Sequence, residues 1–319
     1  MAVGKALKGL IIAIIVIVVI ALILGIVAAV LLNMTPNKLG FGDTAIINGE
    51  SFNSLGLGDT KLINIIKQFK SIYKPDESAI VKNGYSAKTQ EPVAESNLST
   101  GSNVSTVDGK VDYASLITST VKYDKEYLLT YDDKTLAYIF DQMVRSSDGS
   151  NAALKTINEM KATVKEVSIT KSNGEAKFRI VLAASLAKFK DQINNELGKF
   201  ANIVKVPDTV YMVSYLKLDA VDANGKLVLS SESLKINDQS EGVTKAVLKV
   251  LSSEAGLSGD SEAEINKNVA DAISTIVSHL GKVGTATEID ATTKEITGSA
   301  RIGETGVMNG KISVVTHKQ

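Results

Sequence analysis

Residues 209–236 read TVYMVSYLKLDAVDANGKLVLSSESLKI. Two runs rich in Val, Leu and Tyr flank the turn residues Asp222-Ala-Asn-Gly225. Strand-forming residues on both sides of a short Asn-Gly turn are typical of a β-hairpin. The stretch therefore predicts two paired strands, over 209–221 and 226–236.

A second hairpin is predicted upstream, where residues 164–170 and 177–184 flank Ser172-Asn173-Gly174. Apolar periodicity predicts helices over 130–144, 186–200, 242–251 and 262–280, and strands over 286–290, 295–302 and 307–315. Strands and helices do not alternate as β-α-β units, so a doubly wound sheet is disfavoured. The sequence predicts an α+β fold in which one N-terminal transmembrane helix precedes a mixed, largely antiparallel domain.

The N-terminal part contains a long apolar run. Residues 10–32 include no charge, no amide and no proline over 23 positions. A helix of this length measures roughly 35 Å, which spans a hydrocarbon core of about 30 Å. The run therefore predicts a membrane-spanning helix.

Flanking charges predict the orientation of this helix. Lys5 and Lys8 precede the run, whereas Lys38 follows it and is offset by Asp43. The positive-inside rule then places the N-terminus in the cytoplasm. A cleaved signal peptide is the alternative, since Val27-Ala28-Ala29 could serve a signal peptidase, but secretory apolar regions are typically about 7–15 residues long. We expect a single-pass protein of the cell membrane with an extracytoplasmic C-terminal domain.

The chain is accordingly divided into five segments. They are a cytoplasmic tail (1–9), a transmembrane helix (10–32), a juxtamembrane segment with a helix over 60–74 (33–82), a flexible linker or loop (83–110) and an α+β domain (111–319). The linker is predicted because this segment is rich in Ser, Thr and Asn and has few large apolar residues.

The juxtamembrane segment contains a short duplication. Residues 39–48 and 55–64 share the pattern Leu-Gly-x-Gly-Asp-Thr at an offset of 16 residues. A phosphate-binding loop is one interpretation, but the third glycine of a dinucleotide site and the Gly-Lys-Ser/Thr of a Walker loop are missing. Turns and helix capping are the alternative, with Asp59 or Thr60 as the N-cap of the helix over 60–74.

Composition excludes several classes of function. The chain has no cysteine, which excludes disulfides, thiol chemistry and a lipid anchor on cysteine. Its 35 basic residues are balanced by 35 acidic ones. This balance gives no electrostatic reason to expect nucleic-acid binding.

Catalytic patterns are weak. Ser-x-x-Lys, the pattern of penicillin-binding enzymes, occurs four times, at Ser71/Lys74, Ser168/Lys171, Ser185/Lys188 and Ser214/Lys217. The companion Ser-Asp-Asn and Lys-Thr-Gly elements are absent. Neither His279 nor His317 has a metal-ligand spacing, so no catalytic residue, metal site or cofactor is predicted.

The N-terminal anchor, the helix-hairpin-helix order and the long strand pair 209–219 and 226–236 give the chain a partial likeness to known proteins. It resembles uncharacterised membrane-anchored envelope proteins of low-GC Gram-positive bacteria whose ectodomains look like tubular lipid-binding (BPI-like) modules. The resemblance covers residues 111–319 and includes no diagnostic motif. It implies a curved sheet wrapped on a long helix, with an apolar groove for a lipid.

Phe178, Ile180 and Leu182 share one face of the strand over 177–184, so they are the candidate lining of such a groove. A closed core is the alternative for these three residues, since most apolar strand faces are core. The leading hypothesis is a non-catalytic, membrane-tethered envelope protein that binds a lipid, another apolar ligand or a protein partner. The alternative is an extracytoplasmic serine hydrolase or acyl-transferase that uses a Ser-x-x-Lys pair.

Overall fold

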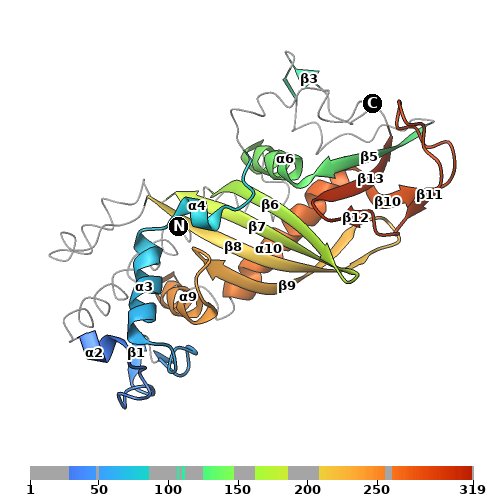
Figure 1. Cartoon of the computed structure of the whole chain (residues 1–319). Coiled ribbons are helices and arrows are strands. Elements are labelled where there is room, and N and C mark those ends of the chain that lie inside the picture. Colours follow the sequence, from blue (N-terminus) through green and yellow to red (C-terminus); the bar gives the residue numbers. More distant parts are fainter. Residues whose placement is uncertain are drawn as a thin grey trace. The chain divides into compact units, whose positions relative to one another are not determined.

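The computed structural model describes residues 29–47, 50–85, 106–107, 110–111, 125–146, 162–185, 208–255 and 261–317 (Figure 1). These residues form a mixed α+β structure with antiparallel sheets and several helices, as the sequence predicts. Contacts divide the chain into two compact units. Unit 1 comprises residues 1–80, 183–213 and 233–265, and unit 2 comprises 81–182, 214–232 and 266–319. The units therefore do not follow the linear order of the chain.

The two predicted hairpins form one four-stranded sheet. Its strands are β6 (Ala162–Ser172), β7 (Glu175–Ser185), β8 (Thr209–Val221) and β9 (Leu227–Ile236), in the order β6-β7-β8-β9. Asn173 and Gly174 turn the first hairpin with φ of 51° and 82°. Positive φ at both central residues matches the twist of the flanking strands, which explains the Asn-Gly pair.

The outer edge of β6 is covered by side chains and backbone from elsewhere in unit 2. The amide of Val164 donates to Asp141 of helix α6 (Asp133–Ser146) at 2.9 Å. The carbonyl of Ile169 accepts from the amide of Gly310 at 2.8 Å. These bonds satisfy groups that would otherwise offer a template for another strand.

A second sheet is centred on β13 (Lys311–His317). The strand pairs antiparallel with β5 (Glu126–Asp132), β10 (Lys282–Ala286) and β12 (Val307–Met308), and β11 (Ala300–Ile302) pairs with β10. Val314 lies opposite both Leu129 and Val283, and all three side chains are fully buried. Their burial forms the apolar centre of this sheet.

Several predicted boundaries in this sheet were wrong. Residues 130–132 belong to β5 rather than to the following helix, because pairing with β13 supplies their backbone partners. Helix α6 begins at Asp133, where the Asp132 carboxylate accepts from the amide of Thr135 at 2.7 Å and so caps the helix. Residues 286–290 and 295–302 are mostly irregular, with isolated bridges such as that between Ile289 and Ile296.

The predicted helical faces are confirmed where the structure describes them. Helices α3 (Leu62–Tyr73), α9 (Glu241–Ala255) and α10 (Ser261–Leu280) occupy the predicted regions. Their buried residues recur at helical spacing; in α10 they include Val269, Ile273, Ile276, Val277 and Leu280. The N-cap of α3 was predicted wrongly, since it is Lys61 and makes no side-chain cap bond.

The remaining described elements are short. They are α2 (Ala29–Leu32), α4 (Glu77–Ile80), the pair β1 (Ala45–Ile47) and β2 (Glu50–Ser51), and the pair β3 (Thr106–Val107) and β4 (Lys110–Val111). Among the described residues no helix is both long and apolar enough to span a membrane. Most of the predicted transmembrane run, the predicted helix over 186–200 and most of the linker lie outside the described residues.

Candidate functional site

The predicted groove residues lie in the interior of β7. Phe178, Ile180 and Leu182 are each at most 1% exposed. Arg179, between two of them, points to the opposite face of the sheet because successive strand residues alternate. The three apolar residues therefore share one buried face, and none of them lines the groove described below.

The opposite face carries a buried ion pair. Glu166 on β6 accepts from the Arg179 guanidinium at 2.5 Å, and their side chains are only 1% and 12% exposed. The other carboxylate oxygen accepts from the backbone amides of Lys82 and Asn83, at 2.6 and 3.0 Å. Burial alone would raise the pKa of Glu166, but the Asn83 amide, Arg179 and the Ser168 hydroxyl outweigh it and hold that pKa below its usual range.

Arg179 is itself held from β8. Its Nε donates to the Tyr215 hydroxyl at 3.3 Å, and its guanidinium carbon lies 5.8 Å from the centre of the same ring. Glu166 has a donor at both carboxylate oxygens, so the network ties residues 82 and 83 to the sheet. This cluster is a structural anchor rather than an open site.

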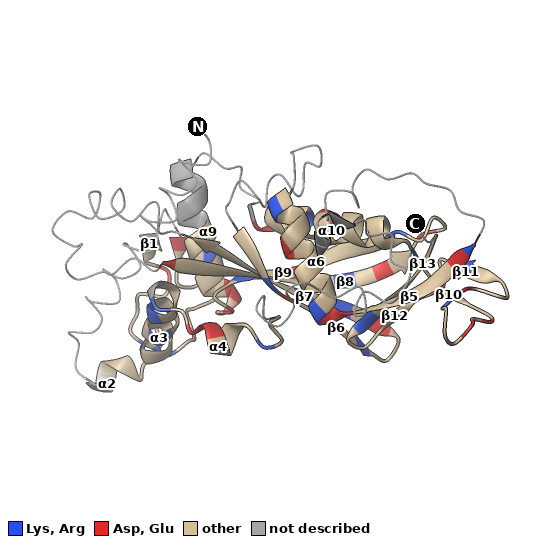
Figure 2. Cartoon of the chain, turned by 90° about the horizontal axis from the view of Figure 1, so that it is seen from above, with Lys and Arg blue, Asp and Glu red and all other residues tan. Residues whose placement is uncertain are grey.

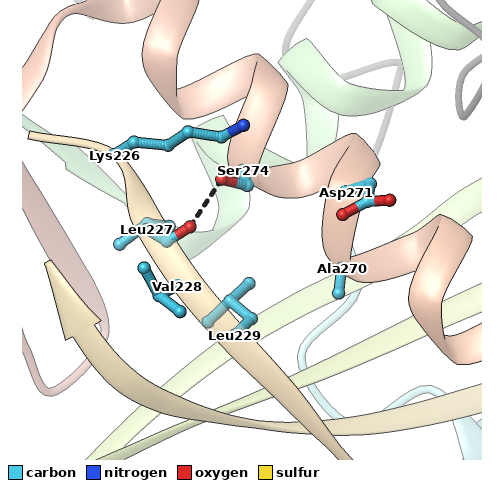
Figure 3. Close-up of a pocket in the computed structure, with 7 residues that line it drawn as sticks. All are labelled: Lys226, Leu227, Val228, Leu229, Ala270, Asp271 and Ser274. Carbon is cyan, nitrogen blue, oxygen red and sulfur yellow. Dashed lines mark hydrogen bonds between the residues drawn. The ribbon is translucent and has the colours of Figure 1, made fainter. Parts of the chain in front are cut away.

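The candidate binding site is a groove between β9 and α10 (Figure 3). It has a volume of about 240 Å³ and is lined by Lys226, Leu227, Val228, Leu229, Ala270, Asp271 and Ser274. All of these residues belong to unit 2. The apolar part comes from the strand and from Ala270, while the polar groups stand at one end of the groove and along the helix (Figure 3). We call this feature the β9–α10 groove.

Two contacts fix the walls of the groove. The Ser274 hydroxyl donates to the carbonyl of Leu227 at 2.7 Å, which joins the helix to the strand at one end (Figure 3). Two turns earlier in α10, the Asn266 amide donates to the Ser231 hydroxyl at 2.7 Å. Since β9 is the last strand in the sheet order, the groove follows a strand edge.

The turn before β9 is positioned by the second sheet. Gly225 has φ of 76°, and the amide of Val283 on β10 donates to its carbonyl at 2.8 Å. A Cβ at this position would lie 2.6 Å from the Cβ of Lys282, so only glycine allows the close approach. The end of the groove at Lys226 is therefore held by a backbone contact.

Opposite charges flank the apolar surface of the groove. Lys226 is exposed and has no carboxylate partner in the part of the chain that the structure describes. Asp271 forms a surface ion pair with Lys267, one turn earlier on α10. Such an exposed pair contributes little, about 0.2–1 kcal/mol, so Asp271 can exchange its partner. Val228, which is 44% exposed, offers an accessible apolar side chain in the same groove.

The Ser-x-x-Lys pairs that the structure describes are not assembled for catalysis. Ser168 and Lys171 lie three residues apart on β6, as do Ser214 and Lys217 on β8, so each pair points to opposite faces of its strand. Instead, Lys171 donates to Thr305 at 2.7 Å, and Lys217 pairs with Glu175 at 3.1 Å.

In the Ser71/Lys74 pair, the Ser71 hydroxyl donates to the carbonyl of Gln68 within α3. In the Ser185/Lys188 pair, Lys188 lies outside the described residues. No cluster of potential metal ligands occurs among the residues that were placed.

Two buried polar atoms, Ser214 Oγ and Asn266 Oδ1, have no hydrogen-bond partner in the described structure. Neither residue lines the β9–α10 groove. Charged residues of both signs are distributed over the described helices and strands (Figure 2). This distribution agrees with the balanced composition of the chain.

Sequence reasoning did not identify the β9–α10 groove. Its strand residues were interpreted only as one half of a hairpin, and its helix residues only as part of an amphipathic helix. The apolar Val228 two positions after Lys226 was the available local signal, but the packing of α10 against β9 depends on tertiary structure. When compared with known proteins, the chain matches no family model, and no curated protein or solved structure is similar to it.

Proposed function

We propose that this chain is a non-catalytic, membrane-tethered protein of the cell envelope that binds an extended segment of a partner protein. The apolar run over 10–32 supports the tether. The β9–α10 groove is the main observation that supports a binding function.

The size of the groove favours a side chain over a whole lipid. Pockets for small molecules typically enclose about 300–1,000 Å³, whereas this groove encloses about 240 Å³. A protein segment needs only to insert one large apolar side chain beside Val228 and Ala270. Its flanking residues then meet the two charges, so the partner segment carries an acidic residue toward Lys226 and a basic residue toward Asp271.

Selection of displayed random peptides on the full-length chain in nanodiscs tests this proposal. We expect enriched peptides to contain a large apolar residue next to an acidic one. Val228→Asp should weaken their binding at least tenfold. A selection on Lys226→Glu should no longer enrich peptides with the acidic residue.

Met308→Asp is the matched control, because Met308 is a strand residue with a similar exposure of 41% outside the groove. Peptides that bind both Asp variants equally well would contradict the groove as the binding site. A phospholipid retained by the chain in native mass spectrometry and lost on Val228→Asp would favour a lipid ligand instead.

A further inference from the structure

The segment that follows the apolar run is folded onto itself in two equivalent loops. Residues 37–44 read NKLGFGDT, and residues 53–60 read NSLGLGDT. The amide of Asn37 donates to the carbonyl of Gly58 at 3.0 Å, and the amide of Asn53 donates to the carbonyl of Gly42 at 2.9 Å. We call residues 34–62 the double loop. In each half, the asparagine amide donates to the carbonyl of the equivalent glycine in the other half.

The double loop is also closed at its base. The amide of Leu62, at the start of α3, donates to the carbonyl of Met34 at 2.9 Å. Met34 lies only two residues beyond Leu32, the last residue of the apolar run and of α2. Two residues span at most about 7 Å, so no flexible tether separates the run from the folded part of unit 1.

This short connection sets the height of the double loop above a bilayer. The headgroup layers add about 10–15 Å to a core of about 30 Å, which leaves roughly 5–8 Å on each side. The first fixed point of the fold, at Met34, therefore falls within the headgroup layer if residues 10–32 span the core.

The exposed lysines of the double loop suit this position. Lys38 and Lys61 are exposed and have no carboxylate partner among the residues that the structure describes. Asp43 and Asp59 are instead engaged by Asn53 and Asn37, at 2.7 and 2.9 Å. Because neither lysine is paired with a carboxylate among the described residues, both ammonium groups are available to lipid phosphates, which attract lysines at an anionic membrane surface.

We infer that the double loop lies in the phospholipid headgroup layer and binds lipid phosphates through Lys38 and Lys61. The inference rests on the membrane tether proposed above. It does not depend on the β9–α10 groove. The double loop acts as a rigid collar that keeps the folded part of unit 1 at the membrane surface.

Fluorescence quenching in lipid vesicles tests the collar. Because the chain has no cysteine, Ala45→Cys, at an exposed position of the double loop, provides a single labelling site on the full-length protein and leaves Lys38 and Lys61 in place. The vesicles contain phosphatidylcholine and phosphatidylglycerol with a nitroxide-labelled headgroup lipid as quencher. In the control variant, a 20-residue Gly/Ser linker is inserted between Leu32 and Asn33, which adds a mean span of roughly 25 Å.

We expect at least twofold stronger quenching at position 45 when Leu32 and Asn33 are joined directly than in the linker variant. Flotation of the same vesicles distinguishes failure of the membrane tether from failure of the collar. A chain that does not float overturns the tether and the collar together. A chain that floats but shows equal or no quenching in the two variants overturns the collar alone.

Discussion

Asn37 and Asn53 occupy equivalent positions in two repeats 16 residues apart, and each donates its side-chain amide to the aspartate of the other repeat. The same residues exchange backbone bonds with Gly58 and Gly42. Each repeat therefore depends on the other for its conformation. This reciprocity explains why the motif occurs twice although two copies cannot form a solenoid.

Removal of either asparagine side chain should loosen both loops. Asn53→Ala deletes the bond to Asp43, and a lost side-chain hydrogen bond costs about 0.5–1.5 kcal/mol. We expect faster hydrogen exchange at the amides of residues 37 and 53 together. Asn64→Ala, at an exposed position on α3, is the control and should leave both amides protected. Faster exchange at residue 53 alone would mean that the loops are independent.

The glycines that face these asparagines should resist substitution for a steric reason. A Cβ at Gly42 would collide with the side-chain amide oxygen of Asn37. Gly42→Ala should therefore displace Asn37 and cost about 1–3 kcal/mol, as overpacking does. Gly40→Ala is a useful comparison, because its Cβ would meet nothing within 4 Å and only its φ of 78° is unfavourable. Thermal unfolding should rank Gly42→Ala as the more destabilising variant; the reverse order would refute the steric reason.

The buried ion pair on the sheet should be sensitive to loss of one partner. Arg179→Met leaves the Glu166 carboxylate buried without its counter-ion, which costs about 3–5 kcal/mol. Lys177→Met is the matched control on the same strand, since Lys177 and Glu232 are 47% and 31% exposed and such a pair contributes about 0–1 kcal/mol. Urea unfolding followed by circular dichroism measures both changes. Equal losses in the two variants would show that burial does not distinguish the pairs.

The same pair predicts a pH dependence of stability. The pKa of Glu166 is lower in the folded chain than its ordinary value of about 4.3, because the Asn83 amide, Arg179 and Ser168 outweigh the effect of burial. The carboxylate therefore stabilises the fold above that ordinary value, and this stabilisation is lost as the pH falls through the folded pKa. Between pH 5 and pH 3, we expect the free energy of unfolding to fall more steeply for the parent chain than for Glu166→Gln. Parallel pH profiles would contradict this assignment.

Asn237 should be the most sensitive polar residue of unit 1. Its side chain accepts from the amide of Tyr211 at 2.7 Å and donates to the carbonyls of Ser71 and Ile72 at 3.0 Å, and it is 1% exposed. Asn237→Ala removes two bonds to the end of α3 and one to β8, and it should cost about 2–4 kcal/mol.

Asn237→Gly separates the side-chain contribution from that of the backbone, because glycine adopts the φ of 51° without strain. Urea unfolding should show Asn237→Gly to be about 1 kcal/mol less destabilising than Asn237→Ala. If Asn237→Gly were as stable as the parent chain, the three bonds would contribute nothing.

Local patterns predicted the hairpins and the helical faces, because turn chemistry and the periods of strands and helices involve residues close in sequence. The turn at Asn173 and Gly174 and the buried face of α10 are examples. The same reasoning failed at 130–132, where pairing with β13 outweighed a helical pattern. It also assigned Asp59 to a helix cap, although Asn37 uses its carboxylate.

Residue patterns and composition were enough to predict the α+β class, the two central hairpins, the amphipathic helices and the lack of cysteine chemistry. Folding of the whole chain was needed to show that Phe178, Ile180 and Leu182 are buried, that Glu166 pairs with Arg179, and that a groove lies between β9 and α10. The physical reason is that a side chain's burial and partner depend on segments far away in the chain. Periodicity marks which face of an element is apolar, but the packing of the whole domain selects what covers that face.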